Sequence, residues 1–231
     1  MRIKNSAFQL ESVFDHDADR NMVDALRAAV VEDLHALHGR YPRFGTVTAA
    51  DLDAEVYAEM REKYHRILHY GVFSLPGKRT LANELIWKWT EATGKYVGCQ
   101  FWSIGAKSVF DQEVRSAGGW PITVRLARML ERKLSTKSRP NAIKLTHEHV
   151  YPIKDIKLLL ASKNSLTREE IRELLERQCM SCVLLESEHD RSAGHDSNPW
   201  LRYKNAGNIR LADNPAWLDS QRKTIIQAGL L

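Results

Sequence analysis

The sequence contains no long apolar run and little cysteine. No stretch of about eighteen apolar residues occurs, so we expect no membrane-spanning helix and no membrane partner. The first residues also lack the apolar segment of a secretory signal, which predicts a cytoplasmic protein. The three cysteines, Cys99, Cys179 and Cys182, are an odd number. In a chain without an export signal they favour reduced thiols over a disulfide framework.

The composition is that of a globular protein with unevenly distributed charge. At 231 residues with 43% hydrophobic side chains, the chain is long enough to bury a substantial core. Its net charge is +5, but residues 1–70 hold nine basic and twelve acidic side chains. Residues 71–231 therefore hold the other 25 basic and 17 acidic side chains, a net charge of +8. We expect this basic part to meet any anionic partner.

The densest positive charge lies between Arg125 and Lys144, where seven basic side chains accompany one acidic residue, Glu131. The candidates for nucleic-acid binding in this segment are Arg125, Arg128, Arg132, Lys133, Lys137 and Arg139. Such side chains neutralise phosphates, so binding would weaken steeply as salt is added. A solvated helix face has the same composition, and charge alone leaves both interpretations open.

The N-terminal part of the chain has the apolar spacing of helices. Hydrophobic residues recur every three or four positions between Val23 and Leu37, before Gly39. Residues 50–70 form a second segment of this kind, with the acidic start and basic end that suit the helix dipole. Thr80 is placed to cap a third helix, and residues 122–134 predict a fourth. The inward face of the fourth is predicted to contain Val124, Leu126, Met129 and Leu130.

The C-terminal part mixes strands and helices. Residues 143–151 and 183–185 predict strands, and residues 153–160 and 166–177 predict helices between them. A further helix could begin near residue 187, and a short one follows residue 200, whereas residues 96–102 fit a strand or an apolar loop. The expected fold class is therefore α+β, mainly helical. We expect a helical region over residues 1–138, for recognition or for binding a partner or second copy, and a second region over residues 139–231.

The segment Leu145-Thr-His-Glu-His-Val-Tyr-Pro152 carries the clearest functional signal. Glu148 supplies a carboxylate and His149 an imidazole, and His189 follows about forty residues later. Successive side chains of a strand point to opposite faces, so Glu148 and His149 serve one site only if the strand ends or bends there. Pro152 favours such an ending, because it lacks an amide donor and restricts the residue before it to extended geometry.

These residues resemble the HNH, or ββα-metal, nucleases. In that family a strand ends in a metal ligand followed by a histidine general base, often with a proline three residues later, and a later helix adds a histidine ligand. The resemblance implies that Glu148 and His189 bind a cation and that His149 is the base. It extends to a set of uncharacterised bacterial proteins through residues 102–106, 146–152 and 200–207. No asparagine stands clearly at the family's middle position, and the insertion between the strands is long.

The resemblance implies a ββα-metal nuclease module at the C-terminus that cleaves nucleic acid, expected to be DNA, as in restriction or phage defence. The chemistry is consistent, because a neutral imidazole accepts a proton from water while a cation relieves charge on the phosphate. Mixed carboxylate and imidazole ligands favour Mg²⁺ or Mn²⁺, and Zn²⁺ or Ni²⁺ also bind such groups. Further candidates for nucleic-acid contact are Trp200, Arg202, Tyr203 and Lys204.

Two functions without catalysis remain open at this stage. Cys179 and Cys182 have zinc-ligand spacing and, with histidines such as His147, could complete a structural zinc site in a nucleic-acid-binding protein. Because Cys182 adjoins an apolar run, buried free thiols are the preferred interpretation. Alternatively, the acidic helical region binds a protein partner.

Overall fold

The structure of the chain is a computed structural model that describes residues 17–40, 62, 80–120, 122–135, 143–189, 199–205, 209–214 and 217–231. The predicted helix over residues 50–70, apart from Glu62, and the predicted boundary between residues 138 and 139 lie outside these ranges. The described residues form two compact units. One unit is drawn from Thr93–Val150 and Met180–Leu231, and the other from His16–Ala92 and Tyr151–Cys179.

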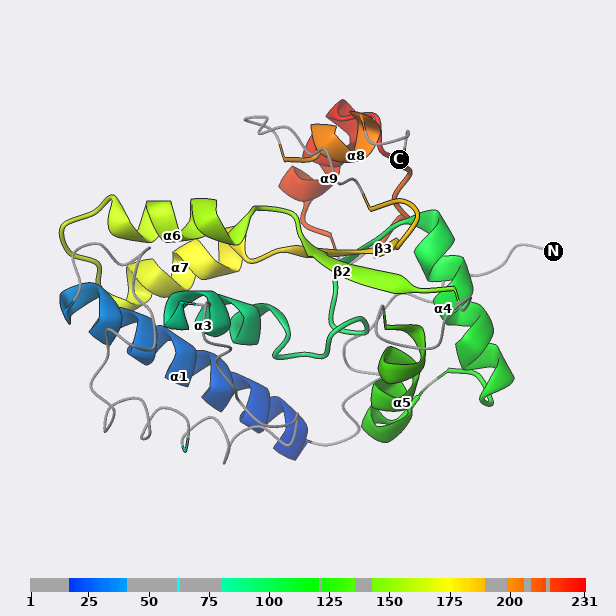
Figure 1. Cartoon of the computed structure of the whole chain (residues 1–231), viewed down its shortest axis with the longest axis horizontal. Coiled ribbons are helices and arrows are strands. Elements are labelled where there is room, and N and C mark those ends of the chain that lie inside the picture. The colour runs from blue at the N-terminus through cyan, green and yellow to red at the C-terminus, as the bar shows by residue number, and fades with distance from the viewer. Residues whose placement is uncertain are drawn as a thin grey trace. The chain divides into compact units, whose positions relative to one another are not determined.

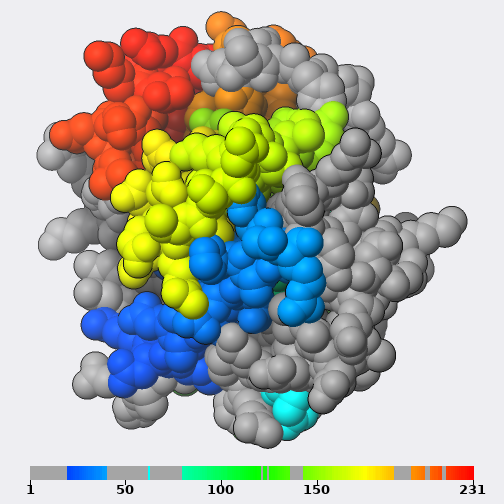
Figure 2. Space-filling model, turned by 90° about the vertical axis from the view of Figure 1, so that its left-hand side faces the viewer, coloured from blue at the N-terminus to red at the C-terminus, as the bar shows by residue number. Residues whose placement is uncertain are grey.

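The described residues of the second unit fold into helices. Its elements are α1 (Asp17–Arg40), α3 (Leu81–Thr90), α6 (Ile153–Ala161) and α7 (Arg168–Gln178) (Figure 1). Helix α1 packs on α3 and α7, and α6 packs on the same two helices. The blue α1 and the yellow α7 lie side by side on the face shown in Figure 2. The long insertion between the two predicted strands therefore contributes α6 and α7, two of the four helices named here.

The sequence signals for these helices are confirmed. The apolar positions predicted for α1 are all buried: Val23, Leu26, Val30, Leu34 and Leu37. Thr80 caps α3 by accepting a hydrogen bond from the amide of Asn83. Thr167 caps α7 in a capping box with Glu170, in which each side chain accepts from the other residue's amide. Local caps and one apolar stripe thus account for where these helices begin and which face they bury.

The first unit is built on a three-stranded sheet. Its strands are β1 (Phe101–Trp102), β2 (Leu145–His149) and β3 (Ser181–Leu185), in the order β1-β3-β2. β3 pairs with β1 in parallel and with β2 antiparallel, in a register that sets Glu148 opposite Cys182 and His149 opposite Ser181. Both predicted strands are confirmed, with β3 beginning two residues earlier than expected. The central β3 is buried along most of its length.

Four helices complete the described part of the first unit. They are α4 (Ile104–Ser116), α5 (Val124–Leu134), α8 (Leu201–Asn205) and α9 (Asp219–Gln227). The sequence analysis did not predict α4, although its buried residues Ala106, Phe110 and Val114 recur every four positions. On α5 the prediction that Met129 points inward is wrong. Its side chain is 57% exposed, because Ala127, Leu130 and Leu134 form the buried stripe instead.

The expected fold class, α+β and mainly helical, is confirmed for the described residues. The ββα-metal arrangement remains a prediction. A turn at residues 186–188 follows β3 where a helix was expected to begin, and residues 190–198 lie outside the described part.

We expect Gly98→Ala to destabilise the chain, because Gly98 lies in the turn that precedes β1 against the backbone of Thr93. A Cβ at position 98 would lie 2.6 Å from the Thr93 carbonyl carbon, where backbone must shift to make room. The expected loss in the free energy of unfolding is about 1–3 kcal/mol, measured by urea denaturation.

Gly39→Ala is the matched control. Gly39 lies in α1 with nothing within 4 Å of the added methyl group, so a gain of up to about 1 kcal/mol is expected from helix propensity. Equal effects of the two substitutions would contradict the packing described for Gly98.

Candidate functional site

The end of β2 presents its side chains alternately to two faces of the sheet. Leu145, His147 and His149 are buried on one face, and Thr146 and Glu148 are partly exposed on the other. This alternation continues through His149, so the strand does not bend before the Glu148-His149 pair. The site at this strand end is therefore built around Glu148.

Glu148 lies between two groups from distant parts of the sequence. Its Oε1 forms an ion pair with Nη1 of Arg202 at 2.8 Å, and its Oε2 lies 3.9 Å from Nε2 of His189. The Glu148 side chain is 14% exposed and that of His189 is 34% exposed. The structure thus brings together the carboxylate and the later histidine that the sequence predicted to share a site.

Arg202 is anchored by three contacts. Besides the ion pair with Glu148, its Nη2 donates to the backbone carbonyl of His149 and to the hydroxyl of Tyr203, the latter at 3.1 Å. The guanidinium thereby joins α8 to the last residues of β2. Its position in the sequence predicted Arg202 only as a nucleic-acid contact and did not reveal that it pairs with Glu148. Nothing in the sequence spacing indicates which carboxylate such an arginine contacts.

His149 does not share the face of Glu148. Its ring is 7% exposed and meets the ring of His147 edge to face, with centroids 5.6 Å apart. Burial, followed by the nearby Arg202 guanidinium, lowers the pKa of His149 to about 4. Burial also lowers the pKa of His147 well below its usual range. Both rings are therefore neutral at physiological pH, and in this arrangement the predicted general base lacks access to a water beside Glu148.

Glu188 belongs to the turn that carries His189. Its Oε2 accepts hydrogen bonds from the Ser103 hydroxyl at 2.5 Å and from the Leu185 amide at 2.9 Å. Gly105 fits closely here, because a Cβ at that position would lie 2.8 Å from Oε1 of Glu188. Ser103 also caps α4 by accepting from the amide of Ala106. The carboxylate at position 188 thus holds the turn in place next to His189.

Glu148 and His189 could supply two of the ligands of a divalent cation. A carboxylate oxygen and an imidazole nitrogen 3.9 Å apart can both reach one ion at ligand distances of about 2.0–2.2 Å each. Within the described ranges, however, no three side chains of the metal-binding types are grouped closely enough to hold an ion. Water or a bound phosphate would supply the remaining ligands, as is usual for Mg²⁺.

The cysteines are free thiols, as the sequence analysis preferred. Burial raises the pKa of both Cys179 and Cys182, which keeps these thiols protonated and poor as metal ligands. Cys182 is completely buried in β3, opposite Glu148 in the strand register. The alternative zinc site with Cys179, Cys182 and His147 therefore has no support among the described residues.

The predicted nucleic-acid contacts separate into exposed and buried groups. On α5, Arg125 and Arg132 are exposed and Arg128 is half-buried, while the exposed Lys133 pairs with Glu113 at 2.5 Å. Lys204 on α8 is also exposed. Lys137 and Arg139 lie outside the described residues.

Trp200 and Tyr203 are corrected to core residues. Each is 2% exposed, and Trp200 packs edge to face on Phe101 with ring centroids 4.8 Å apart. Aromatic rings in this position cannot stack on bases. Their closeness to the motif in sequence suggested contacts with nucleic acid, but both side chains pack in the core of their unit.

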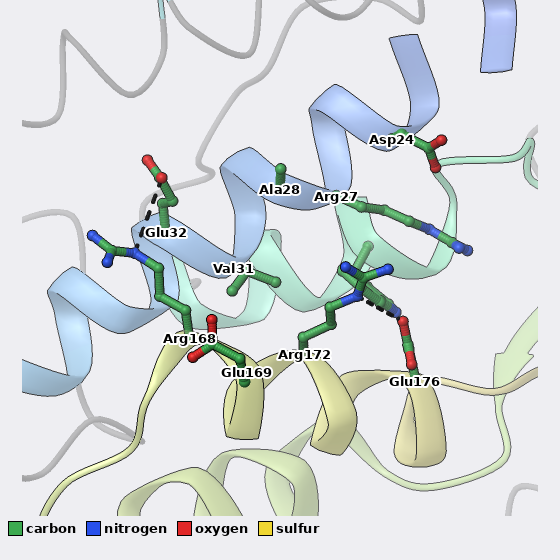
Figure 3. A pocket seen from close by; sticks show the side chains of 10 residues that line it. Asp24, Arg27, Ala28, Val31, Glu32, Arg168, Glu169, Arg172 and Glu176 are labelled. Atoms are coloured by element: carbon green, nitrogen blue, oxygen red, sulfur yellow. Dashed lines mark hydrogen bonds and ion pairs between the residues drawn. The ribbon is translucent and has the colours of Figure 1, made fainter. Parts of the chain in front are cut away.

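A hollow lies in the helical unit, between α1 and α7 (Figure 3). It has a volume of about 440 Å³. It is lined by Trp89 and Val31 and by charged residues of both signs: Asp24, Arg27, Glu32, Arg168, Glu169, Arg172 and Glu176. Arg172 pairs with Glu176 at 2.9 Å, and Arg168 pairs with Glu32 at 4.0 Å. Because these charges largely neutralise one another, the hollow does not select a ligand of either sign.

Comparison with protein-family models, curated proteins and solved structures finds no match. In the ranges that the structure describes, no helix has the length and apolarity needed to cross a membrane.

We expect the folded chain to lose stability as pH falls from about 6.5 to about 4. In this range the unfolded chain protonates position 149, whereas the folded chain resists protonation because the pKa of His149 is about 4. The stabilisation from the neutral ring is fully present above pH 6.5 and is lost as pH falls toward 4. It amounts to at most about 3 kcal/mol, measurable by urea denaturation at several pH values.

His149→Gln should flatten this part of the pH dependence and leave the part due to His147. An unchanged slope in the variant would show that His149 is not protected from protons in the folded chain.

Proposed function

We propose that the chain is a metal-dependent nuclease that hydrolyses phosphodiester bonds in DNA, with Glu148 and His189 as its reactive pair. The observation that carries this proposal is the 3.9 Å distance between Oε2 of Glu148 and Nε2 of His189. The two residues are separated by an insertion that folds with the other unit, yet their side chains converge on one partly exposed site. This convergence supports the HNH-like interpretation of the sequence.

The residues around Glu148 have roles suited to this reaction. Glu148 and His189 would hold a divalent cation, which when bound supplies neutralisation of phosphate charge and a more acidic water. Arg202 keeps the Glu148 carboxylate oriented through its Oε1, which leaves Oε2 directed toward His189. Lys204 is exposed on the same short helix as Arg202 and is available to a phosphate oxygen.

The geometry does not favour His149 as the general base. His149 was predicted for this role, but its buried ring lies on the other face of β2 from Glu148. A proton acceptor must lie within hydrogen-bond reach of the water that it activates. We therefore propose that the nucleophile depends on the Glu148-His189 pair, and that His149 contributes its neutral ring to packing and its carbonyl to Arg202.

Cleavage of supercoiled plasmid with Mn²⁺ tests the assignment. We expect the parent chain to nick plasmid, EDTA to stop the reaction, and Glu148→Gln or His189→Ala to reduce the rate at least about 100-fold, because each removes one of the two donors. His149→Gln, checked for folding by circular dichroism, should retain activity within about tenfold.

The outcomes separate three alternatives. Loss of cleavage in folded His149→Gln would restore His149 as the base. Full activity of both Glu148→Gln and His189→Ala would overturn the proposed site. DNA binding without nicking in Mg²⁺ or Mn²⁺ would favour a nucleic-acid-binding protein without catalysis.

The exposed arginines of α5 are proposed to contact phosphates. Replacing both Arg125 and Arg132 by Gln should weaken DNA binding at low salt and reduce the slope of log affinity against log salt by about 2. Lys133→Gln is the matched control on the same helix. Because Lys133 already pairs with Glu113, its replacement should change the slope less than the replacement of the two arginines does. Fluorescence anisotropy with a labelled duplex measures both. Equal slopes in the parent and the double variant would exclude this helix from the interface.

A further inference from the structure

The Glu148 site is close to electrical neutrality before any ligand binds. The carboxylate of Glu148 carries one negative charge, and the guanidinium of Arg202 neutralises it at 2.8 Å. His189 supplies a nitrogen donor but no negative charge. A divalent cation that enters this site without another ligand would meet one carboxylate, that of Glu148. The charge of this carboxylate is already offset by the guanidinium of Arg202.

Arg202 is held too firmly to move aside easily. It contacts the His149 carbonyl and the Glu148 carboxylate of β2 and the Tyr203 hydroxyl of α8. Its side chain is only 11% exposed. Replacing these contacts with water would leave buried polar groups of Tyr203 and the strand end without this donor. The positive charge is therefore a permanent part of the site.

We propose that this site takes up its divalent cation together with a nucleic-acid phosphate and not before it. This inference rests on the proposed function, and it assigns Arg202 as the positioning residue that makes the two binding events depend on each other. A phosphodiester adds the negative charge and the oxygen ligands that the described protein groups lack. Magnesium-type ions are commonly held in this way, by one or two carboxylates and substrate phosphates.

The linkage has a strict consequence. If a phosphodiester tightens cation binding by some factor, the cation must tighten nucleic-acid binding by the same factor. We expect the parent chain to bind Mn²⁺ weakly by itself, and Mn²⁺ to tighten binding of a short phosphorothioate DNA duplex at least about tenfold at constant ionic strength. Isothermal titration measures Mn²⁺ binding to the protein alone, and fluorescence anisotropy measures the affinity for DNA with Mn²⁺ or with EDTA.

Three variants isolate the charge of Arg202. Arg202→Gln removes it and should bind Mn²⁺ at least about tenfold more tightly than the parent without DNA, because Glu148 is no longer neutralised. Arg202→Lys keeps the charge and should bind Mn²⁺ as weakly as the parent, which also shows that a lost guanidinium contact is not the cause. Lys223→Gln makes the same change of charge at an exposed position on α9 and should leave Mn²⁺ affinity unchanged.

The results distinguish this inference from the proposed function. Tight Mn²⁺ binding by the parent that DNA does not change, but that Glu148→Gln abolishes, would overturn the inference and leave the nuclease proposal standing. Equal Mn²⁺ affinity of folded Arg202→Gln and the parent would also overturn it. An absence of Mn²⁺ effects on DNA binding, together with no plasmid cleavage, would overturn both.

Discussion

The alternation of side chains along β2 is the constraint on which the candidate site depends. In an unbent strand, neighbouring residues cannot face the same side. His147 and His149 therefore enter the core together, whereas Glu148 reaches the opposite face, where His189 and Arg202 lie. A bend in the strand before residue 148 would change which of these side chains face the core. The pairing of β2 with β3 over five consecutive residues prevents that bend.

The two faces of the strand end have opposite electrostatic character. On the buried face the imidazoles are neutral, because burial disfavours their charged forms. On the other face the carboxylate of Glu148 forms an ion pair with Arg202, and such a partly buried carboxylate needs a partner of this kind. After burial, the same guanidinium is the second cause that lowers the pKa of His149, and it also forms the ion pair with Glu148, so one residue of α8 acts on both faces.

The sequence predicted the parts of the fold that depend on local signals. The apolar stripe of α1 and the caps at Thr80 and Thr167 involve residues within a few positions of one another, so they can be read from spacing alone. The proximity of Glu148 and His189 was predicted through a family resemblance, because no local rule links residues on either side of a long insertion. The ion pair of Glu148 with Arg202, and the burial of Trp200 and Tyr203, depend on how α8 packs, which spacing does not encode.

Arg202 also explains why the sequence signal for catalysis and the geometry differ. The motif suggested that the carboxylate and the imidazole of residues 148 and 149 act together on one ligand. In the structure they are connected through Arg202 instead, by the side chain of Glu148 and by the backbone carbonyl of His149. An adjacent pair of functional residues at a strand end can thus share one positively charged partner without sharing a face. For such a pair, the alternation of the strand determines which side chain a ligand can reach, and here that side chain is Glu148, beside His189.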